Sequence, residues 1–194
     1  MIGIYGGTFD PIHNGHLHVI KELLLSRRLD RIIVLPAGDP QLRGRPSASA
    51  VDRLAMCTAA LASLGALADR VEVSAIEVER DRPSYAIESV RQLQKENPAQ
   101  EFAWIIGSDA FRRIDEWHES EVLQELISFI VVERPESERG QGEVFDDFDT
   151  TEINALDISA TQIREKIGSG QEVSALVPTG VLSYIESKGL YGSA

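Results

Sequence analysis

The chain has 194 residues, of which 43% are hydrophobic, and a formal net charge of −12. This length favours one domain with its own core, and the acidic balance argues against nucleic-acid and anionic-membrane partners, which need basic surfaces. Cys57 is the only cysteine, which excludes an intrachain disulfide and a cysteine metal cluster. No apolar run of about 20 residues and no signal-peptide-like start is evident, so we expect a cytoplasmic protein.

Short apolar segments alternate with helical patterns along the chain. The predicted strands are Ile2–Tyr5, Ile32–Leu35, Arg70–Ser74, Glu101–Ile106 and Leu126–Glu133. The predicted helices are Leu17–Arg28, Ala48–Leu64 (with Asp52 and Arg53 on its polar side), Ser84–Glu96, Ser159–Ile167 and Pro178–Ser187. The predicted loops are Ala37–Ser49, which follows a strand end and faces the site side, and the acidic Glu136–Thr151.

This alternation predicts an α/β fold, a doubly wound parallel sheet of about five to six strands. We expect a single domain over residues 1–194. Its sheet core would occupy 1–150, and a small helical part would occupy 151–194.

The most informative segment is the turn Gly6–His16, which joins the first predicted strand to the first predicted helix. In an open parallel sheet, ligands bind at such turns, where free N–H groups favour phosphate and glycine lets the backbone approach an anion. His13 and His16 lie three residues apart, so both can face one bound group. A histidine near a helix start is also commonly a cap or a solvated surface residue. The whole turn indicates nucleotide phosphate chemistry.

This turn resembles the signature of a known enzyme family. His13-Asn14-Gly15-His16 matches the (T/H)-x-G-H motif of the nucleotidyltransferase superfamily, and with the preceding Gly-Gly-Thr-Phe-Asp-Pro it is similar to the nicotinate-nucleotide adenylyltransferases. The resemblance spans Ile2 to Tyr191 and implies a Rossmann-like fold. The residues of the turn that it implies for ATP binding are Gly6, Gly7, Thr8 and Phe9.

A second phosphate-binding element follows in Asp157–Arg164. Ser159, with the glutamine three positions later, has the spacing of a capping box that opens a helix. Thr161 and Arg164 share one face of that helix, and a helix N-terminus with an arginine in its first turns can clamp a polyphosphate. The segment resembles the family's I-S-S-T-x-I-R motif, with Ala160 in place of the middle serine.

A third element combines Gly107 and Asp109, at a strand end, with the later Trp117. A carboxylate at this position can bind ribose hydroxyls or an adenine edge, although a helix N-cap is the alternative for Asp109. The segment is similar to the family's I-G-A-D followed by a tryptophan. The resemblance implies that Gly107 and Asp109 contact the adenosine part. It also implies that Trp117, for which a core position is the alternative, stacks on the nicotinate ring.

Two further segments resemble the family's acceptor-binding motifs, with substitutions. Ser84-Tyr85-Ala86 is similar to the S-Y-T motif near the nicotinate carboxylate, and Ala86 leaves a backbone N–H but no hydroxyl. Asp39–Arg43 stands where the family has a P-P-H-K loop, so Arg43 would take over the charge of the lysine. These departures leave nicotinamide mononucleotide open as an alternative acceptor.

The resemblance implies adenylyl transfer from ATP to nicotinate mononucleotide, with release of pyrophosphate. His16 would donate a hydrogen bond to the α-phosphate, while His13 and Arg164 would hold the phosphate chain. Ser159 and Thr161 would hold its β/γ end. Mg²⁺ would bridge the substrate phosphates, and no metal cage is predicted in the protein.

Other readings remain open from the sequence. The acceptor could be another phosphorylated molecule such as phosphopantetheine, whose enzymes share the histidine motif. A nucleotide-binding sensor without turnover would not need a histidine aimed at the α-phosphate. The sequence also leaves open whether copies of the chain form a homo-oligomer.

Overall fold

The computed structural model describes residues 1–41, 44–133, 149–153 and 156–193. Within these ranges, six strands form one parallel sheet in the order β3-β2-β1-β4-β5-β6. The strands are β1 (Ile2–Gly7), β2 (Arg31–Pro36), β3 (Val71–Val73), β4 (Phe102–Gly107), β5 (Ser128–Glu133) and β6 (Asp149–Glu152). The strand order reverses between β1 and β4. In such sheets a ligand crevice opens at this reversal, outside the carboxyl ends of the strands.

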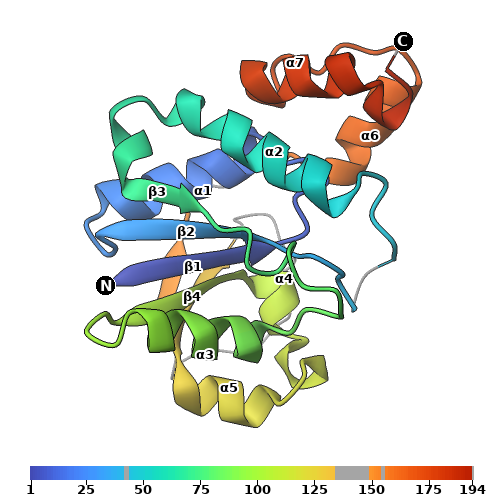
Figure 1. Cartoon of the computed structure of the whole chain (residues 1–194). Helices are drawn as coiled ribbons and strands as arrows, with labels where there is room; N and C mark the ends of the chain where they lie inside the picture. Colours follow the sequence, from blue (N-terminus) through green and yellow to red (C-terminus); the bar gives the residue numbers. More distant parts are fainter. Residues whose placement is uncertain (42–43, 134–148, 154–155, 194) are drawn as a thin grey trace.

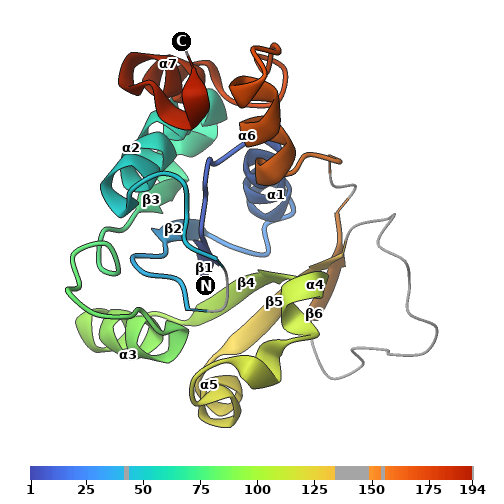
Figure 2. The same cartoon turned by 90° about the vertical axis from the view of Figure 1, so that its right-hand side faces the viewer.

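Helices cover both faces of the sheet (Figures 1 and 2). On one face lie α1 (Asn14–Leu25) and α2 (Ala50–Ala60), with α6 (Ala160–Gly168) and α7 (Thr179–Lys188) beside them. On the other face lie α3 (Ala86–Glu96), α4 (Ser108–Phe111) and α5 (Ser120–Leu126). Short 3₁₀ helices span Leu61–Arg70, Ile114–Glu116 and Leu190–Gly192. The predicted doubly wound α/β fold is therefore confirmed.

The central strands are apolar throughout because both of their faces are covered. In β4, Ala103 and Ile105 belong to the core on the α1 side, whereas Trp104 and Ile106 belong to the core on the α3 side. All four side chains are 4% exposed or less. Successive side chains of a strand point to opposite faces, so one continuous apolar run supplies both cores.

Several predicted helix and strand boundaries are wrong. α1 begins at Asn14, three residues before the predicted Leu17, because His13 already serves as its N-cap with an extended backbone. It also ends earlier than predicted, at Leu25. Leu126 is the last residue of α5, a helix that was not predicted, and β5 begins two residues later.

The helix predicted over Ala48–Leu64 differs in two respects. It ends as an α-helix at Ala60 and continues as a 3₁₀ helix, in which Gly65 has a φ of 58° and a ψ of −128°. Arg53 does not lie on a polar side, because it is only 1% exposed.

The stretch Ala50–Arg70 is long and apolar enough to cross a membrane by length and composition, with a mean hydropathy of 1.4 over an 18-residue window. The expectation that no segment has this property is therefore wrong. The stretch is weak evidence for a membrane span, because its α-helical part covers only Ala50–Ala60. At 1.5 Å per residue this part is about 16 Å long, roughly half of a bilayer core.

The two predicted loops are only partly described. Residues 37–41 and 44–49 contain neither helix nor strand, and Arg43 lies outside the described residues. In the acidic segment, residues 149–152 form β6, which pairs in parallel with β5, so this part of the loop prediction is wrong. Residues 134–148 lie outside the described residues.

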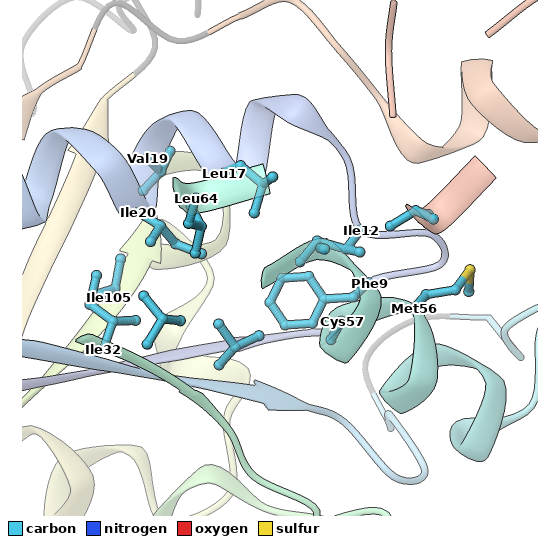
Figure 3. Close-up of a cluster of buried hydrophobic side chains, with 14 of the residues drawn as sticks. Phe9, Ile12, Leu17, Val19, Ile20, Ile32, Met56, Cys57, Leu64 and Ile105 are labelled. Atoms are coloured by element: carbon cyan, nitrogen blue, oxygen red, sulfur yellow. The ribbon is translucent and has the colours of Figure 1, made fainter. Parts of the chain in front are cut away.

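The turn after β1 is anchored in the core on the α1 side (Figure 3). Phe9 and Ile12 are 3% and 1% exposed, and they lie in the same buried cluster as Met56 and Cys57 of α2. Burial of a large apolar side chain stabilises a fold by roughly 1.5–3 kcal/mol. The turn that carries the histidines is thus fixed by its own apolar residues.

Burial also makes Cys57 unreactive. Its side chain is fully buried, and burial raises the pKa of the thiol far above its ordinary value. Because the thiolate is the reacting species, we expect a disulfide reagent to modify the folded protein very slowly and the urea-unfolded protein at once. Rapid labelling of the folded protein would contradict this packing.

Candidate active site

A pocket opens at the reversal of strand order. It is lined by Tyr5, His13, Gly15, His16, Val19, Gly107, Val132 and Leu156. The pocket therefore combines the ends of β1, β4 and β5 with the start of α1. Both histidines of the H-x-G-H motif and the glycine of the Gly-x-Asp motif meet in this one place.

The two histidines are held against each other at the start of α1. Their rings stack with centroids 3.7 Å apart, and the backbone N–H of His13 donates to Nδ1 of His16 over 3.2 Å. A neutral imidazole that accepts at Nδ1 carries its proton on Nε2. The alternative that these residues cap the helix is therefore correct, and the proton of a neutral His16 ring lies on Nε2.

Aromatic side chains surround His16. The ring of Phe9 meets it edge-on at 5.0 Å, and the ring of Tyr5 lies 6.0 Å away. Phe9 has a φ of 50°, and a Cβ at Gly7 would lie 2.8 Å from its ring. Gly7 thus permits the approach of Phe9. Tyr5 lines the pocket and was missed, because in the sequence it is only one residue of a strand.

The second phosphate-binding element docks on the same turn. Nη1 of Arg164 donates to the carbonyl oxygen of Asp10 over 2.7 Å, and Nη2 donates to the Thr161 hydroxyl over 3.3 Å. The Ser159 hydroxyl accepts from the N–H of Gln162, as its capping role predicts. Arg164 and Asp10, which are 154 positions apart in the sequence, thus lie together. Figure 2 shows the same arrangement, with α6 beside α1.

Asp10 ties this region to the C-terminus. Its carboxylate is 5% exposed and accepts from the N–H groups of Ser47 and Ala48, at 2.7 and 3.1 Å, and from the Tyr191 hydroxyl at 2.7 Å. Sequence reasoning missed this role of Asp10, because its partners are remote in the chain. The loop before α2, the C-terminal segment and the turn after β1 therefore share one buried carboxylate.

Loss of the Tyr191 hydroxyl tests this tether. We expect Tyr191→Phe to lower the free energy of unfolding by about 1.5–3 kcal/mol, the usual contribution of a hydrogen bond to a charged group. Urea denaturation measures the change. Tyr184→Phe is the matched control, because the Tyr184 hydroxyl donates to Asp52, near the surface. Equal losses in both variants would contradict a special role for the Asp10 contact.

The Gly-x-Asp motif is divided between two environments. Gly107 is the N-cap of α4 and lines the pocket, so the alternative that Asp109 is the N-cap is wrong. The Asp109 side chain is 69% exposed and pairs with Arg112 at 3.3 Å. It does not line the pocket itself.

Four predicted acceptor residues are described by the structure, and they lie outside the pocket lining: Ser84, Tyr85, Ala86 and Trp117. Tyr85 is the N-cap of α3, and its ring lies 4.3 Å from the ring of His118. Half-buried Trp117 meets buried Trp104 edge-on at 5.9 Å, so it is only partly a core residue. The Ser84 hydroxyl donates to the carbonyl oxygen of Glu77, and Ala86 is the first residue of α3.

In the part of the chain that the structure describes, no group of three or more His, Cys, Asp or Glu side chains could hold a metal ion. Among the described residues, the pocket lining contains two histidines and no carboxylate.

Comparison with known proteins gives consistent results. Residues 4–166 match the sequence model of the cytidylyltransferase-like family. The chain is 39% identical to a probable nicotinate-nucleotide adenylyltransferase of Geobacillus thermodenitrificans, over 99% of this chain and 86% of that protein. It is 38% identical to a probable nicotinate-nucleotide adenylyltransferase of Leifsonia xyli, over 99% and 94%. The fold is similar to the solved Plasmodium falciparum nicotinic acid mononucleotide adenylyltransferase complexed with NaAD, with a TM-score of 0.82, 20% identity and coverage of 100% and 98%.

Proposed function

Because this chain belongs to the nicotinate-nucleotide adenylyltransferases, within the cytidylyltransferase-like family, we propose that it transfers the adenylyl group of ATP to nicotinate mononucleotide. The products are nicotinate adenine dinucleotide and pyrophosphate. The observation that carries this proposal is the pocket in which His13, His16 and Gly107 meet at the strand reversal. The chain acts as a single nucleotidyltransferase domain in this proposal.

The reaction needs positioning more than acid–base catalysis. A phosphate oxygen of the mononucleotide attacks the α-phosphorus of ATP, and the bond from that phosphorus to the bridging oxygen breaks as pyrophosphate leaves. With a second pKa of about 6, the attacking phosphate is already mostly dianionic at pH 7. The protein therefore contributes alignment of the two substrates and stabilisation of the charge on the transferred phosphorus.

We assign one role to each group on the donor side, the part of the site that binds ATP. Nε2 of His16 donates to the α-phosphate, where charge develops during transfer. His13, whose ring stacks on the ring of His16, holds the phosphate chain. The backbone of Gly6, Gly7, Thr8 and Phe9 shapes the loop that the phosphates approach.

Arg164 and the start of α6 complete the donor side. A guanidinium has five N–H donors, of which two are used on Asp10 and Thr161. The remaining donors of Arg164 bind phosphate oxygens, and Ser159 and Thr161 serve the β/γ end. Gly107 and Asp109 serve the adenosine part.

The acceptor side is assigned to Ser84, Tyr85, Ala86, Trp117 and Arg43. Backbone N–H groups at the start of α3 hold the nicotinate carboxylate, because a helix N-terminus favours an anion and Ala86 has no hydroxyl. Trp117 stacks on the pyridine ring. Mg²⁺ bound to the ATP phosphates supplies charge neutralisation, and we assign it no protein ligand.

The test offers ATP and Mg²⁺ with nicotinate mononucleotide or nicotinamide mononucleotide in separate reactions, and measures pyrophosphate and the dinucleotide formed. We expect pyrophosphate and a strong preference for the acid. Preference for the amide would support adenylyl transfer but contradict nicotinate mononucleotide as the acceptor. ATP binding without pyrophosphate release would favour a nucleotide-binding sensor.

We further propose a cytoplasmic location and no nucleic-acid partner, in keeping with the net charge of −12. A mass measurement in solution tests whether copies of the chain form a homo-oligomer.

A further inference from the structure

Two buried charged side chains meet at one glycine beside the site. The first is Arg53 of α2, which is 1% exposed. Its Nη1 donates to the carbonyl oxygen of Thr8 over 2.7 Å, and its Nη2 donates to the carbonyl oxygen of Gly38 over 2.9 Å. Thr8 follows β1 and Gly38 follows β2, so one guanidinium joins the turns at the ends of two neighbouring strands.

The second charged side chain is Glu77, which is 5% exposed and lies between β3 and α3. Its carboxylate accepts from the Ser89 hydroxyl over 2.6 Å. Its carbonyl oxygen accepts from the Ser84 hydroxyl over 3.3 Å. Burial raises the pKa of Glu77, and the hydrogen bond from Ser89 opposes this shift.

The backbone at Gly38 approaches Glu77 more closely than any side chain would allow. A Cβ at this position would collide with the carbonyl oxygen of Glu77 and lie 3.1 Å from the Ser84 hydroxyl. Gly38 therefore has a packing reason to be glycine, and its carbonyl oxygen accepts from Arg53.

We propose that Glu77 and Arg53 are positioning residues of the transfer reaction. Glu77 aligns the two segments that hold the mononucleotide, the loop after β2 and the start of α3. Arg53 couples this acceptor side to the ATP-binding turn after β1. This inference rests on the proposed function, and it assigns the two residues different effects: Glu77 acts on the acceptor alone, and Arg53 acts on both substrates.

The chemistry of the contacts supports charged groups at both positions. Hydrogen bonds to or from an ion are roughly twice as strong as those between neutral groups. The planar fork of arginine reaches two carbonyl oxygens at once, which the single ammonium of lysine does not do in a fixed geometry. A displacement of about 1 Å in substrate position can lower a rate by about 100-fold, so a modest loosening of Gly38 is measurable.

The experiment compares steady-state kinetics of Glu77→Gln and Arg53→Lys in the whole protein, with each substrate varied in turn. We expect Glu77→Gln to raise KM for nicotinate mononucleotide roughly tenfold and to leave KM for ATP unchanged. We expect Arg53→Lys to raise both KM values. Titration of nicotinate mononucleotide by calorimetry checks that the first change is one of binding.

Matched controls separate positioning from stability. Glu79→Gln makes the same change at an exposed carboxylate two residues away. Arg70→Lys alters another arginine that donates to backbone carbonyls, those of Leu24, Leu29 and Asp30, beside the amino ends of the strands. We expect Arg70→Lys to lower the melting temperature while both KM values stay unchanged.

A milder variant covers the case in which Glu77→Gln does not fold. Ser89→Ala removes one hydrogen bond to Glu77 and should raise KM for the mononucleotide by a smaller factor. Equal changes in both KM values for the Glu77 variant, or no change in either, would overturn the positioning role. If the unsubstituted protein shows no turnover with any mononucleotide, the proposed function fails, and the acceptor role of Glu77 fails with it.

Discussion

His16→Ala should fold and lose a factor of roughly 10²–10³ in turnover, the usual effect of removing one preorganised donor from a transition state. The ring is held by stacking on His13 and by the hydrogen bond to its Nδ1, so Nε2 needs no reorganisation when charge develops. The measurement is pyrophosphate release at saturating substrates. A variant with near-normal turnover would exclude His16 from the reaction.

The same substitution also removes a helix cap, and a second variant separates the two effects. Loss of a cap costs about 1 kcal/mol, which shifts the melting temperature by about 2–4 °C in a chain of this size. Gln is the residue that ordinarily completes a capping box at this position, so His16→Gln should restore most of the melting temperature. We expect turnover to stay low in His16→Gln, because the imidazole donor is still missing.

Arg164→Ala should lower kcat/KM for ATP by a similar factor of roughly 10²–10³. The guanidinium reaches the turn that carries the histidines, where Nη1 binds the carbonyl oxygen of Asp10. Its loss removes a positive charge from the phosphate chain and releases α6 from this turn. Steady-state kinetics with ATP varied, together with a melting curve, measures both consequences.

Two further variants show whether charge or geometry matters at this position. Arg164→Lys keeps the charge but not the planar fork, and we expect an intermediate loss. Lys166→Ala removes a positive charge from the same helix, where its ammonium contacts Gln171 instead of the turn. If Lys166→Ala lowered kcat/KM for ATP as much as Arg164→Ala, the effect would be one of general charge. That result would contradict the proposal that Arg164 binds the phosphate chain directly.

The fold class could be predicted from the sequence, and the sequence motifs also predict a site for ATP at the turn after the first strand. Buried strands leave continuous apolar runs, and their alternation with helices indicates a parallel sheet. The H-x-G-H turn and the second phosphate-binding segment are local patterns, because each needs only a helix start and a few adjacent side chains. The structure brings both motifs together at the turn after β1.

Short helices and strands without a clear apolar pattern could not be predicted from the sequence. α5 has only seven residues, and β6 has four in an acidic segment without an apolar run. The start of α1 was placed too late because the capping role of His13 depends on backbone geometry. In these cases, tertiary packing overrides a weak local signal.

The roles of the buried polar side chains depend on contacts between segments that are remote in the chain. Arg53 reads as a surface residue in a helical pattern, yet it is buried, and its guanidinium donates to two backbone carbonyls from other loops. Asp10 and Glu77 follow the same rule, since each is buried among donors that are distant in the chain. A charge can be buried only where partners offset its lost hydration, and the chain fold alone determines which partners meet.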